Sequence, residues 1–168
     1  MKIKLFIVAI ILSVNSFSQN SDNARQSNDF KHHSVYVELL GNSLFYSVNY
    51  DYLLKIYTDN IQMSAGSGIG FFRTSSVDGQ GRVAKHNRFY ITPATTFLFG
   101  AKSHYAEIGT ALMVGSLGKT LKLVPSARIG YRYQRQKGGF LFRIAFTPAF
   151  NDFFIYKYWC GVSVGYIF

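Results

Sequence analysis

The chain has 168 residues, a formal net charge of +10 and a single cysteine, Cys160. This length fits one domain, and one cysteine excludes an intramolecular disulfide and any metal site built from cysteine pairs. Because cysteine often packs as a small hydrophobic residue, we expect that role for Cys160, with a reactive thiol as the alternative. The sequence predicts no cofactor and no metal site.

The N-terminus has the three parts of a secretory signal peptide. Lys2 and Lys4 begin an apolar segment, and Ser16-Phe17-Ser18 follows it with small residues at the spacing that signal peptidase accepts. The apolar run is shorter than the roughly 20 residues of a spanning helix. We expect export through the Sec pathway, cleavage after Ser18, and a flexible polar leader over residues 19–33.

Removing Lys2 and Lys4 with the signal lowers the net charge to 16 − 8 = +8. An exported basic chain rarely meets nucleic acid, so anionic lipopolysaccharide or a charged interior is the favoured counterpart, and simple loop solubility is the alternative.

Eight segments after the leader alternate between apolar and small or polar residues, with turn residues between them. The second segment shows the pattern, since Tyr46, Val48 and Tyr50 alternate with Ser47 and Asn49. A period of two indicates β-strands. The predicted strands are residues 34–40, 44–54, 61–72, 88–99, 104–114, 122–134, 140–150 and 158–168.

An even number of strands returns the C-terminus to the side of the N-terminus, as an up-and-down membrane barrel requires. The turns at 55–60, 100–103 and 135–139 are then periplasmic. The outer loops are 41–43, 73–87, 115–121 and 151–157, and 73–87 is the longest. Pro93, Pro125 and Pro148 fall inside predicted strands, where each removes a ladder donor.

The last strand has a large apolar face and a small one. Tyr158, Cys160, Val162, Val164, Tyr166 and Phe168 share one face, and Trp159, Gly161, Ser163, Gly165 and Ile167 share the other. The segment resembles the C-terminal strand of Gram-negative outer-membrane barrels, which commonly end in Phe. Residues 38–50 are similar to the first hairpin of uncharacterised exported barrels of this size.

The resemblance implies an all-β fold, an antiparallel up-and-down eight-stranded transmembrane β-barrel over residues 34–168, located in the outer membrane. It also implies that Tyr166 and Phe168 form a signal for the barrel-assembly machinery. The implied partners are outer-membrane lipids and lipopolysaccharide, with no nucleic acid, and the chain is expected to be a monomer.

Charged residues on the small, polar faces predict a network inside the barrel. An eight-stranded barrel has room for side chains and little else, so acids and bases on adjacent strands should pair there. We interpret the network as a filling of the lumen, with a proton or ion path as the alternative. Its predicted members are Glu38, Asp51, Glu107, Lys122, Arg128, Arg132 and Arg143.

The longest predicted outer loop carries the densest basic cluster. Arg73, Arg82, Lys85, His86 and Arg88 suit an anionic surface ligand such as lipopolysaccharide phosphate. A solvated loop without a ligand is the alternative. The predicted function is an integral outer-membrane barrel with a structural, adhesive or surface-interaction role.

Two other functions compete with that prediction. A lipid-modifying enzyme would draw on His86 with Ser75, Ser76 and Asp78, but no specific catalytic motif supports it, so no catalytic residue is assigned. A soluble periplasmic lipocalin-like barrel would place its aromatic residues inside. The predicted strands instead gather aromatic residues at both ends of an outward face.

Overall fold

The computed structural model describes residues 31–43, 45–58, 60–77, 83–117, 120–150 and 160–168. These residues form eight β-strands and one short 3₁₀ helix, η1 (Gly41–Ser43). The strands are β1 (His33–Leu39), β2 (Tyr46–Thr58), β3 (Ile61–Val77), β4 (Val83–Ala101), β5 (His104–Leu117), β6 (Thr120–Gln134), β7 (Gly139–Phe146) and β8 (Cys160–Ile167). The predicted signal peptide, and the predicted leader up to residue 30, lie outside the described residues.

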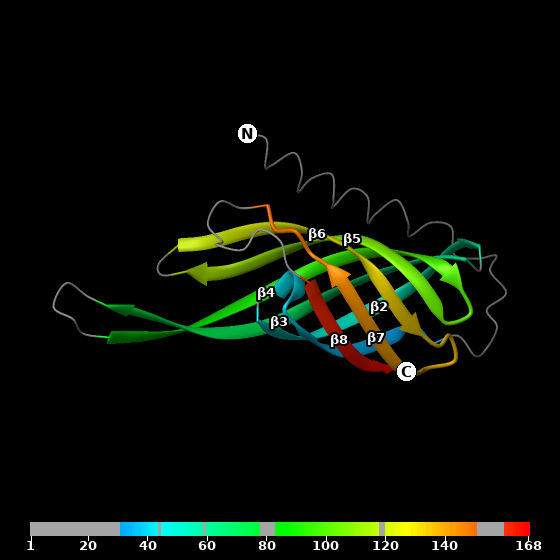
Figure 1. Cartoon of the computed structure of the whole chain (residues 1–168), viewed down its shortest axis with the longest axis horizontal. Coiled ribbons are helices and arrows are strands. Elements are labelled where there is room, and N and C mark those ends of the chain that lie inside the picture. Colours follow the sequence, from blue (N-terminus) through cyan, green and yellow to red (C-terminus); the bar gives the residue numbers. More distant parts are fainter. Residues whose placement is uncertain (1–30, 44, 59, 78–82, 118–119, 151–159) are drawn as a thin grey trace.

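Each strand pairs antiparallel with the next one along the chain, and β8 pairs with β1, so the sheet closes into a barrel (Figure 1). This confirms the predicted eight-stranded up-and-down closed barrel. The barrel closes where His33 and Phe168 exchange backbone hydrogen bonds of 3.2 and 2.9 Å. We call this end the terminal rim and the opposite end the far rim. No helix within the described ranges is long and apolar enough to span a membrane.

The polarity of the barrel is inverted relative to that of a soluble protein. Along β2, Val48 and Tyr50 are exposed, whereas Ser47, Asn49 and Asp51 are buried. Every strand contributes an exposed aliphatic residue near its middle, between 46% and 63% exposed. These residues are Val37, Val48, Ile69, Ile91, Ile108, Ile129, Ile144 and Val164. The alternation that predicted the strands therefore separates an apolar exterior from a polar interior.

Glycines line the interior where neighbouring strands crowd the lumen. A Cβ on Gly66 would collide with the Asp51 side chain and the Tyr50 backbone, and one on Gly165 would collide with Tyr36. Small interior residues therefore leave the space that larger polar side chains fill.

The interior contains apolar clusters at both ends. Toward the far rim, Tyr90, Met113 and Val124 pack together, with Phe72 and Ala149 against them. Toward the terminal rim, one cluster joins Tyr36, Leu141 and Ile167, and another joins Leu53, Leu98 and Tyr105. Charged and polar side chains occupy the lumen between these clusters.

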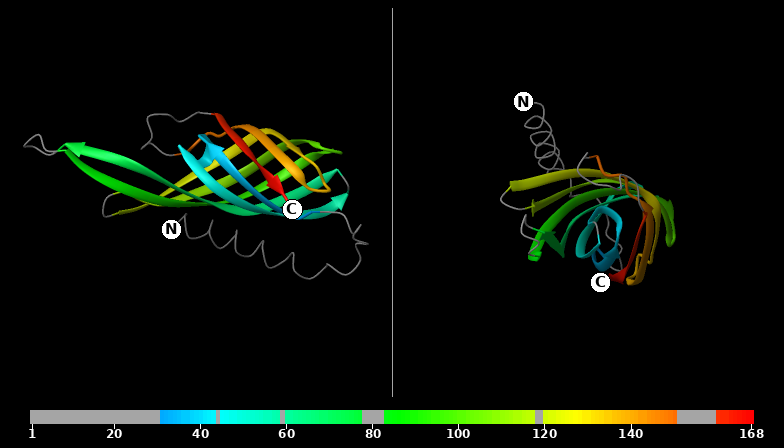
Figure 2. Two further views of the ribbon diagram at one scale, coloured as in Figure 1. Left: turned by 90° about the horizontal axis from the view of Figure 1, so that it is seen from below. Right: turned by 60° about the vertical axis from the view of Figure 1, so that its left-hand side comes forward.

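The prediction of an outer loop at 73–87 was wrong. β3 and β4 stay paired from Ile61↔Phe99 to Val77↔Val83, so only residues 78–82 of the connection lie outside the described residues. β2 pairs with β3 only as far as Ile69, and β5 pairs with β4 only as far as Tyr90. Beyond that level β3 and β4 form a two-stranded ribbon that projects past the barrel (Figures 1 and 2). The ribbon does not enclose a lumen, so its residues need not alternate between apolar and polar. The alternating sequence pattern therefore ends there, although the backbone pairing of the two strands continues.

Other strand limits also differ from prediction. β2 continues to Thr58 through an irregular register, and β5 and β6 pair as far as Leu117↔Thr120, so both connections are shorter than predicted. β7 ends at Phe146, because Pro148 has no N–H to continue a ladder. Beyond it Ala127 N donates to Pro148 O at 3.0 Å, and Phe150 N donates to Pro125 O at 2.9 Å. Tyr158 and Trp159 lie outside the described residues.

Candidate functional site

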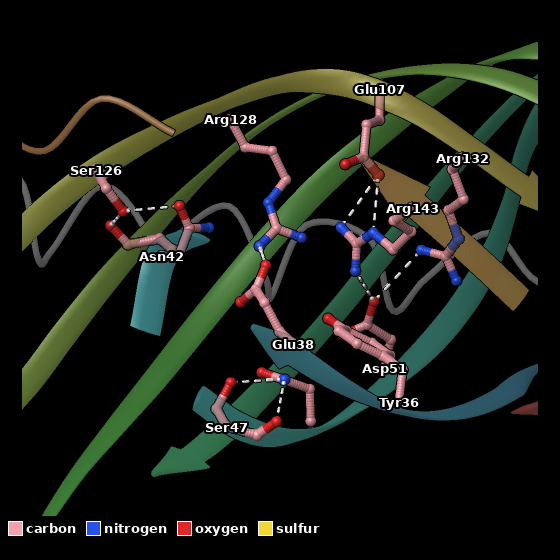
Figure 3. Close-up of polar contacts among 12 residues, drawn as sticks. Tyr36, Glu38, Asn42, Ser47, Asp51, Glu107, Ser126, Arg128, Arg132 and Arg143 are labelled. Atoms are coloured by element: carbon pink, nitrogen blue, oxygen red, sulfur yellow. Dashed lines mark hydrogen bonds and ion pairs between the residues drawn. The ribbon is translucent and has the colours of Figure 1, made fainter. Parts of the chain in front are cut away.

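The first layer of the interior network lies below η1. Leu40 and Gly41 have φ angles of 61° and 77°, and this left-handed turn folds η1 inward. With its amide oriented to satisfy both neighbours, Asn42 donates to Ser126 Oγ at 3.2 Å and accepts from Arg128 Nε at 3.2 Å. Arg128 Nη2 also forms an ion pair with Glu38 Oε1 (Figure 3). This layer ties the β1–β2 turn to β6 across the lumen.

The second layer lies around Arg143. Its Nε and Nη2 both lie 3.0 Å from Glu107 Oε2, and its Nη1 lies 3.5 Å from Asp51 Oδ2. Its guanidinium carbon lies 4.8 Å from the centre of the Tyr36 ring. On the other side of Asp51, Arg132 Nη1 lies 3.4 Å from Oδ2, and the Tyr36 hydroxyl donates to Oδ1 at 3.1 Å (Figure 3). One carboxylate thus joins two arginines and a phenol.

The third layer is neutral and lies toward the terminal rim. Gln134 Nε2 donates to Gln62 Oε1 at 3.1 Å, and Gln62 Nε2 donates to the Tyr105 hydroxyl at 3.3 Å. Both glutamines are fully buried, and Tyr105 is nearly so. The apolar cluster of Leu53, Leu98 and Tyr105 adjoins this layer.

The network balances its charge internally. Glu38, Asp51 and Glu107 are the acidic side chains of the described residues, and all are buried against arginines. Three carboxylates face Arg128, Arg132 and Arg143, so the interior carries equal numbers of positive and negative groups. Removing one partner from such a set leaves an uncompensated buried charge, which is strongly destabilising.

The structure separates the predicted network into two parts. Six members meet in the two charged layers, and the expected pairing of three carboxylates with three arginines is present. Lys122 shares β6 with Arg128 but lies six residues nearer the far rim and is only partly buried. Sequence analysis missed Tyr36, Asn42 and Ser126. Tyr36 could have been predicted, because it lies two residues before Glu38 on β1 and therefore faces inward with it. The sequence around Asn42 contains no signal that this side chain contacts β6 across the lumen.

The predicted surface-binding residues lie on the β3–β4 ribbon. Arg73 is exposed and its Nε donates to Asn87 Oδ1 at 3.2 Å across the ribbon, while Arg88 is partly buried opposite Phe72. Lys85 and His86 belong to β4, opposite Ser75 and Thr74. Arg82 lies outside the described residues. Strand pairing therefore places Arg73, Lys85, His86 and Arg88 on one two-stranded ribbon, each opposite a residue that is not basic.

The residues of the competing enzyme hypothesis are not placed as a catalytic group. Ser75 is exposed on β3, Ser76 pairs with Ala84, and Asp78 lies outside the described residues. Within the described ranges, no three His, Cys, Asp or Glu side chains gather at a spacing suited to a metal ion.

Two imidazole–phenol pairs lie at the terminal rim. His33 Nδ1 lies 2.6 Å from the Tyr50 hydroxyl, and its ring stacks on Phe168 with centroids 5.8 Å apart. On the opposite side of the barrel, His104 Nδ1 lies 2.6 Å from the Tyr131 hydroxyl. Each histidine also packs edge-on against a second tyrosine of the same partner strand. At this rim, therefore, histidine and tyrosine rings contact each other through both their faces and their polar atoms.

No protein-family model, no curated protein and no solved structure matches this chain. The assignment of a function therefore rests on the geometry described above.

Proposed function

We propose that the chain is an integral outer-membrane protein, a monomeric barrel whose lumen is closed by side chains and whose role is structural or surface-interacting. The observation that carries this proposal is the inverted polarity. All eight strands expose aliphatic residues outward, whereas every described carboxylate is buried in the lumen. A continuous apolar belt of this kind suits a lipid environment, because soluble proteins rarely expose large contiguous apolar patches.

Aromatic residues at both ends of the belt support the same proposal. Exposed rings at the terminal rim include Tyr50, Tyr52, Phe99, Tyr131, Phe140, Tyr166 and Phe168. Toward the far rim, Phe71 packs edge-on against Tyr46, with ring centroids 5.1 Å apart, and lies beside Phe89. Such girdles favour the boundary between hydrocarbon and headgroups. Together with the predicted signal peptide, they favour the outer membrane.

The packed lumen favours a role other than transport. The charged layers, the glutamine layer and the apolar clusters all lie in the described interior, and an eight-stranded barrel has an interior just wide enough for side chains. The ribbon of β3 and β4 carries the exposed Arg73, and the backbone positions of Lys85 and His86, beyond the level where β2 pairs with β3, which suits contact with an anionic group at the cell surface. A soluble calyx would need apolar residues inside and charges outside, the reverse of this arrangement.

Fractionation and gel mobility test the membrane proposal. We expect the protein in the outer-membrane fraction, resistant to carbonate extraction, with faster migration on an unboiled gel than after boiling. In planar bilayers, the purified protein should give no stepwise conductance. Recovery as a soluble periplasmic species overturns the membrane assignment, and steady porin-sized conductance overturns the closed lumen.

The enzyme alternative has its own test. Lipid A and phospholipids from cells with and without the protein should have identical acyl compositions by mass spectrometry. A species with an added or missing acyl chain contradicts the structural role.

A further inference from the structure

Arg132 is a fully buried guanidinium whose donors are only partly used. Its Nη1 lies 3.4 Å from Asp51 Oδ2 and its Nη2 lies 3.4 Å from Ser34 Oγ. The first contact is longer than the roughly 2.7–2.9 Å that is usual between a charged nitrogen and a carboxylate oxygen. Its Nε is buried and finds no acceptor among the residues that the structure describes. In Figure 3 a single dashed line leaves Arg132, and it ends on Asp51.

Gln134, the next inward-facing residue of β6, has the complementary deficit. Its Nε2 donates to Gln62 Oε1 at 3.1 Å, whereas its own Oε1 is buried and accepts from no described group. Both Arg132 and Gln134 are 0% exposed. An unused donor and an unused acceptor therefore face the lumen from alternate residues of one strand, where the charged second layer meets the neutral third layer.

The two side chains are held in ways that keep these atoms from pairing directly. Arg132 is tied by its Nη atoms to Asp51 on β2 and Ser34 on β1. Gln134 is tied by its amide nitrogen to Gln62 on β3. Residues two apart on a strand have Cα atoms about 7 Å apart, because the rise is about 3.4 Å per residue. A water molecule with two hydrogen bonds of about 2.9 Å each spans most of that distance.

Buried polar atoms of this kind are rarely left unpaired in folded proteins. Such atoms have lost their solvation, so nearly all of them bond to protein groups or to ordered water. Globular proteins hold about one buried water per 27 residues, which makes internal water an ordinary component of a chain of this size.

The chemistry of the site selects water over an ion. Water accepts one hydrogen bond while it donates another, as an N–H and a carbonyl oxygen together require. An anion would accept from Arg132 Nε but would be repelled by Gln134 Oε1. A cation would suit that oxygen but would be repelled by the guanidinium. The interior charges are already balanced between three carboxylates and three arginines, so neither ion is needed.

We propose that the lumen holds an ordered water molecule that accepts from Arg132 Nε and donates to Gln134 Oε1. This water links the charged second layer to the hydrogen bonds that run from Gln134 through Gln62 to the Tyr105 hydroxyl. The polar interior then forms one connected network between the second layer and the terminal rim. The proposal concerns the lumen alone and does not depend on the membrane location.

A crystal structure of the purified wild-type chain tests the proposal directly. At a resolution that resolves ordered water, we expect a density peak about 2.7–3.2 Å from both Arg132 Nε and Gln134 Oε1. Direct contact between the two side chains, or no density between them, overturns the proposal. A crystal soaked in bromide identifies an anion, because bromide scatters anomalously. An anomalous peak beside Arg132 Nε overturns the assignment to water.

Nuclear magnetic resonance of the same chain in detergent micelles measures the contact in solution. The Arg132 Nε–H proton should give a cross-peak with water, of the sign that marks dipolar contact and not proton exchange. Gln134→Met removes the acceptor with little change in volume and should abolish this cross-peak. The control, Ser126→Ala, removes a buried polar group from the first layer and should leave the cross-peak unchanged.

Three outcomes of the resonance experiment contradict the proposal. The cross-peak is absent in the wild type, it persists in Gln134→Met, or it disappears equally in Ser126→Ala, which would indicate a general loosening of the lumen. The crystal measurement uses the wild-type chain, so it decides the proposal even if either variant fails to fold.

Discussion

Asp51 Oδ2 and Arg132 Nη1 lie 3.4 Å apart across the lumen, although 81 residues separate them in the chain. Each is the middle residue of a Tyr-x-Tyr triplet, 50–52 on β2 and 131–133 on β6. Because side chains alternate across a strand, the two charges point inward while the flanking tyrosines point outward. The same triplets place Tyr50 beside His33 and Tyr131 beside His104 at the terminal rim. One arrangement thus supplies both the interior ion pair and part of the aromatic girdle.

Replacement of Asp51 by asparagine should destabilise the barrel by about 3 kcal/mol, because the loss of one carboxylate leaves the buried arginines uncompensated. The free energy of unfolding in urea, measured in lipid vesicles, checks this value. The double variant Asp51→Asn with Arg132→Gln restores charge balance. The loss in free energy of unfolding of the double variant should be smaller than the sum of the losses of the two single variants by about 1 kcal/mol or more. Simple additivity would show that the network is not coupled as described.

Introduction of a methyl group at Gly66 should destabilise the barrel by about 1–3 kcal/mol, because the new Cβ meets Asp51 and the Tyr50 backbone. Ser67→Ala is the matched control, since Ser67 is the next residue on β3 and faces outward. Urea denaturation of both variants measures the difference. If Gly66→Ala proves as stable as Ser67→Ala, the lumen is less crowded than the structure indicates.

Replacement of Phe168 by alanine should slow assembly into membranes several-fold, if the terminal residue is read by the assembly machinery as proposed. Phe140→Ala provides the control, because Phe140 lies at the same rim and is 52% exposed, against 51% for Phe168. The rate of folding into vesicles with and without reconstituted assembly machinery distinguishes the two. A selective defect of Phe168→Ala in the presence of the machinery supports an assembly signal. Equal defects would indicate loss of girdle area alone.

Shortening the β3–β4 ribbon should leave the barrel folded. Arg73 and Asn87 are directly paired, so replacing residues 74–86 by Asn-Gly closes a two-residue hairpin at a register that already exists. Heat-modifiable migration should be unchanged, while binding of whole cells to an anionic matrix such as heparin should fall.

A charge variant identifies the cause of that fall. Arg82→Gln with Lys85→Gln keeps the ribbon length but removes two cations that the shortening also removes, and it should lower heparin binding to a similar extent, because the cations make the contact. Undiminished binding by both the shortened and the charge-neutralised protein contradicts a surface role for the ribbon.

Sequence periodicity predicted the strands best where one face lines the lumen. The alternation of side chains along the strand was enough to predict that Glu38 on β1 and Arg143 on β7 face the lumen, and both are buried. The prediction failed at residues 73–77 and 83–87, where the ribbon leaves the barrel and no longer separates two environments. It also failed at Phe146, where the end of β7 depends on the Pro148 backbone meeting β6.

The sequence by itself therefore determined the all-β class, the number of strands and the inward or outward side of the charged residues in the lumen, because a strand imposes a period of two on its side chains. Only the tertiary structure decided which charges meet. Asp51 contacts Arg132 and Arg143, and Glu38 contacts Arg128, because the register of eight strands sets the level of each residue in the lumen. Closure likewise joined Lys31, Lys102 and Arg135 at one rim. The face of a strand on which a side chain lies is a local property of the chain. Its position along the barrel axis and the closure of the barrel depend on hydrogen bonds between strands that can be far apart in sequence.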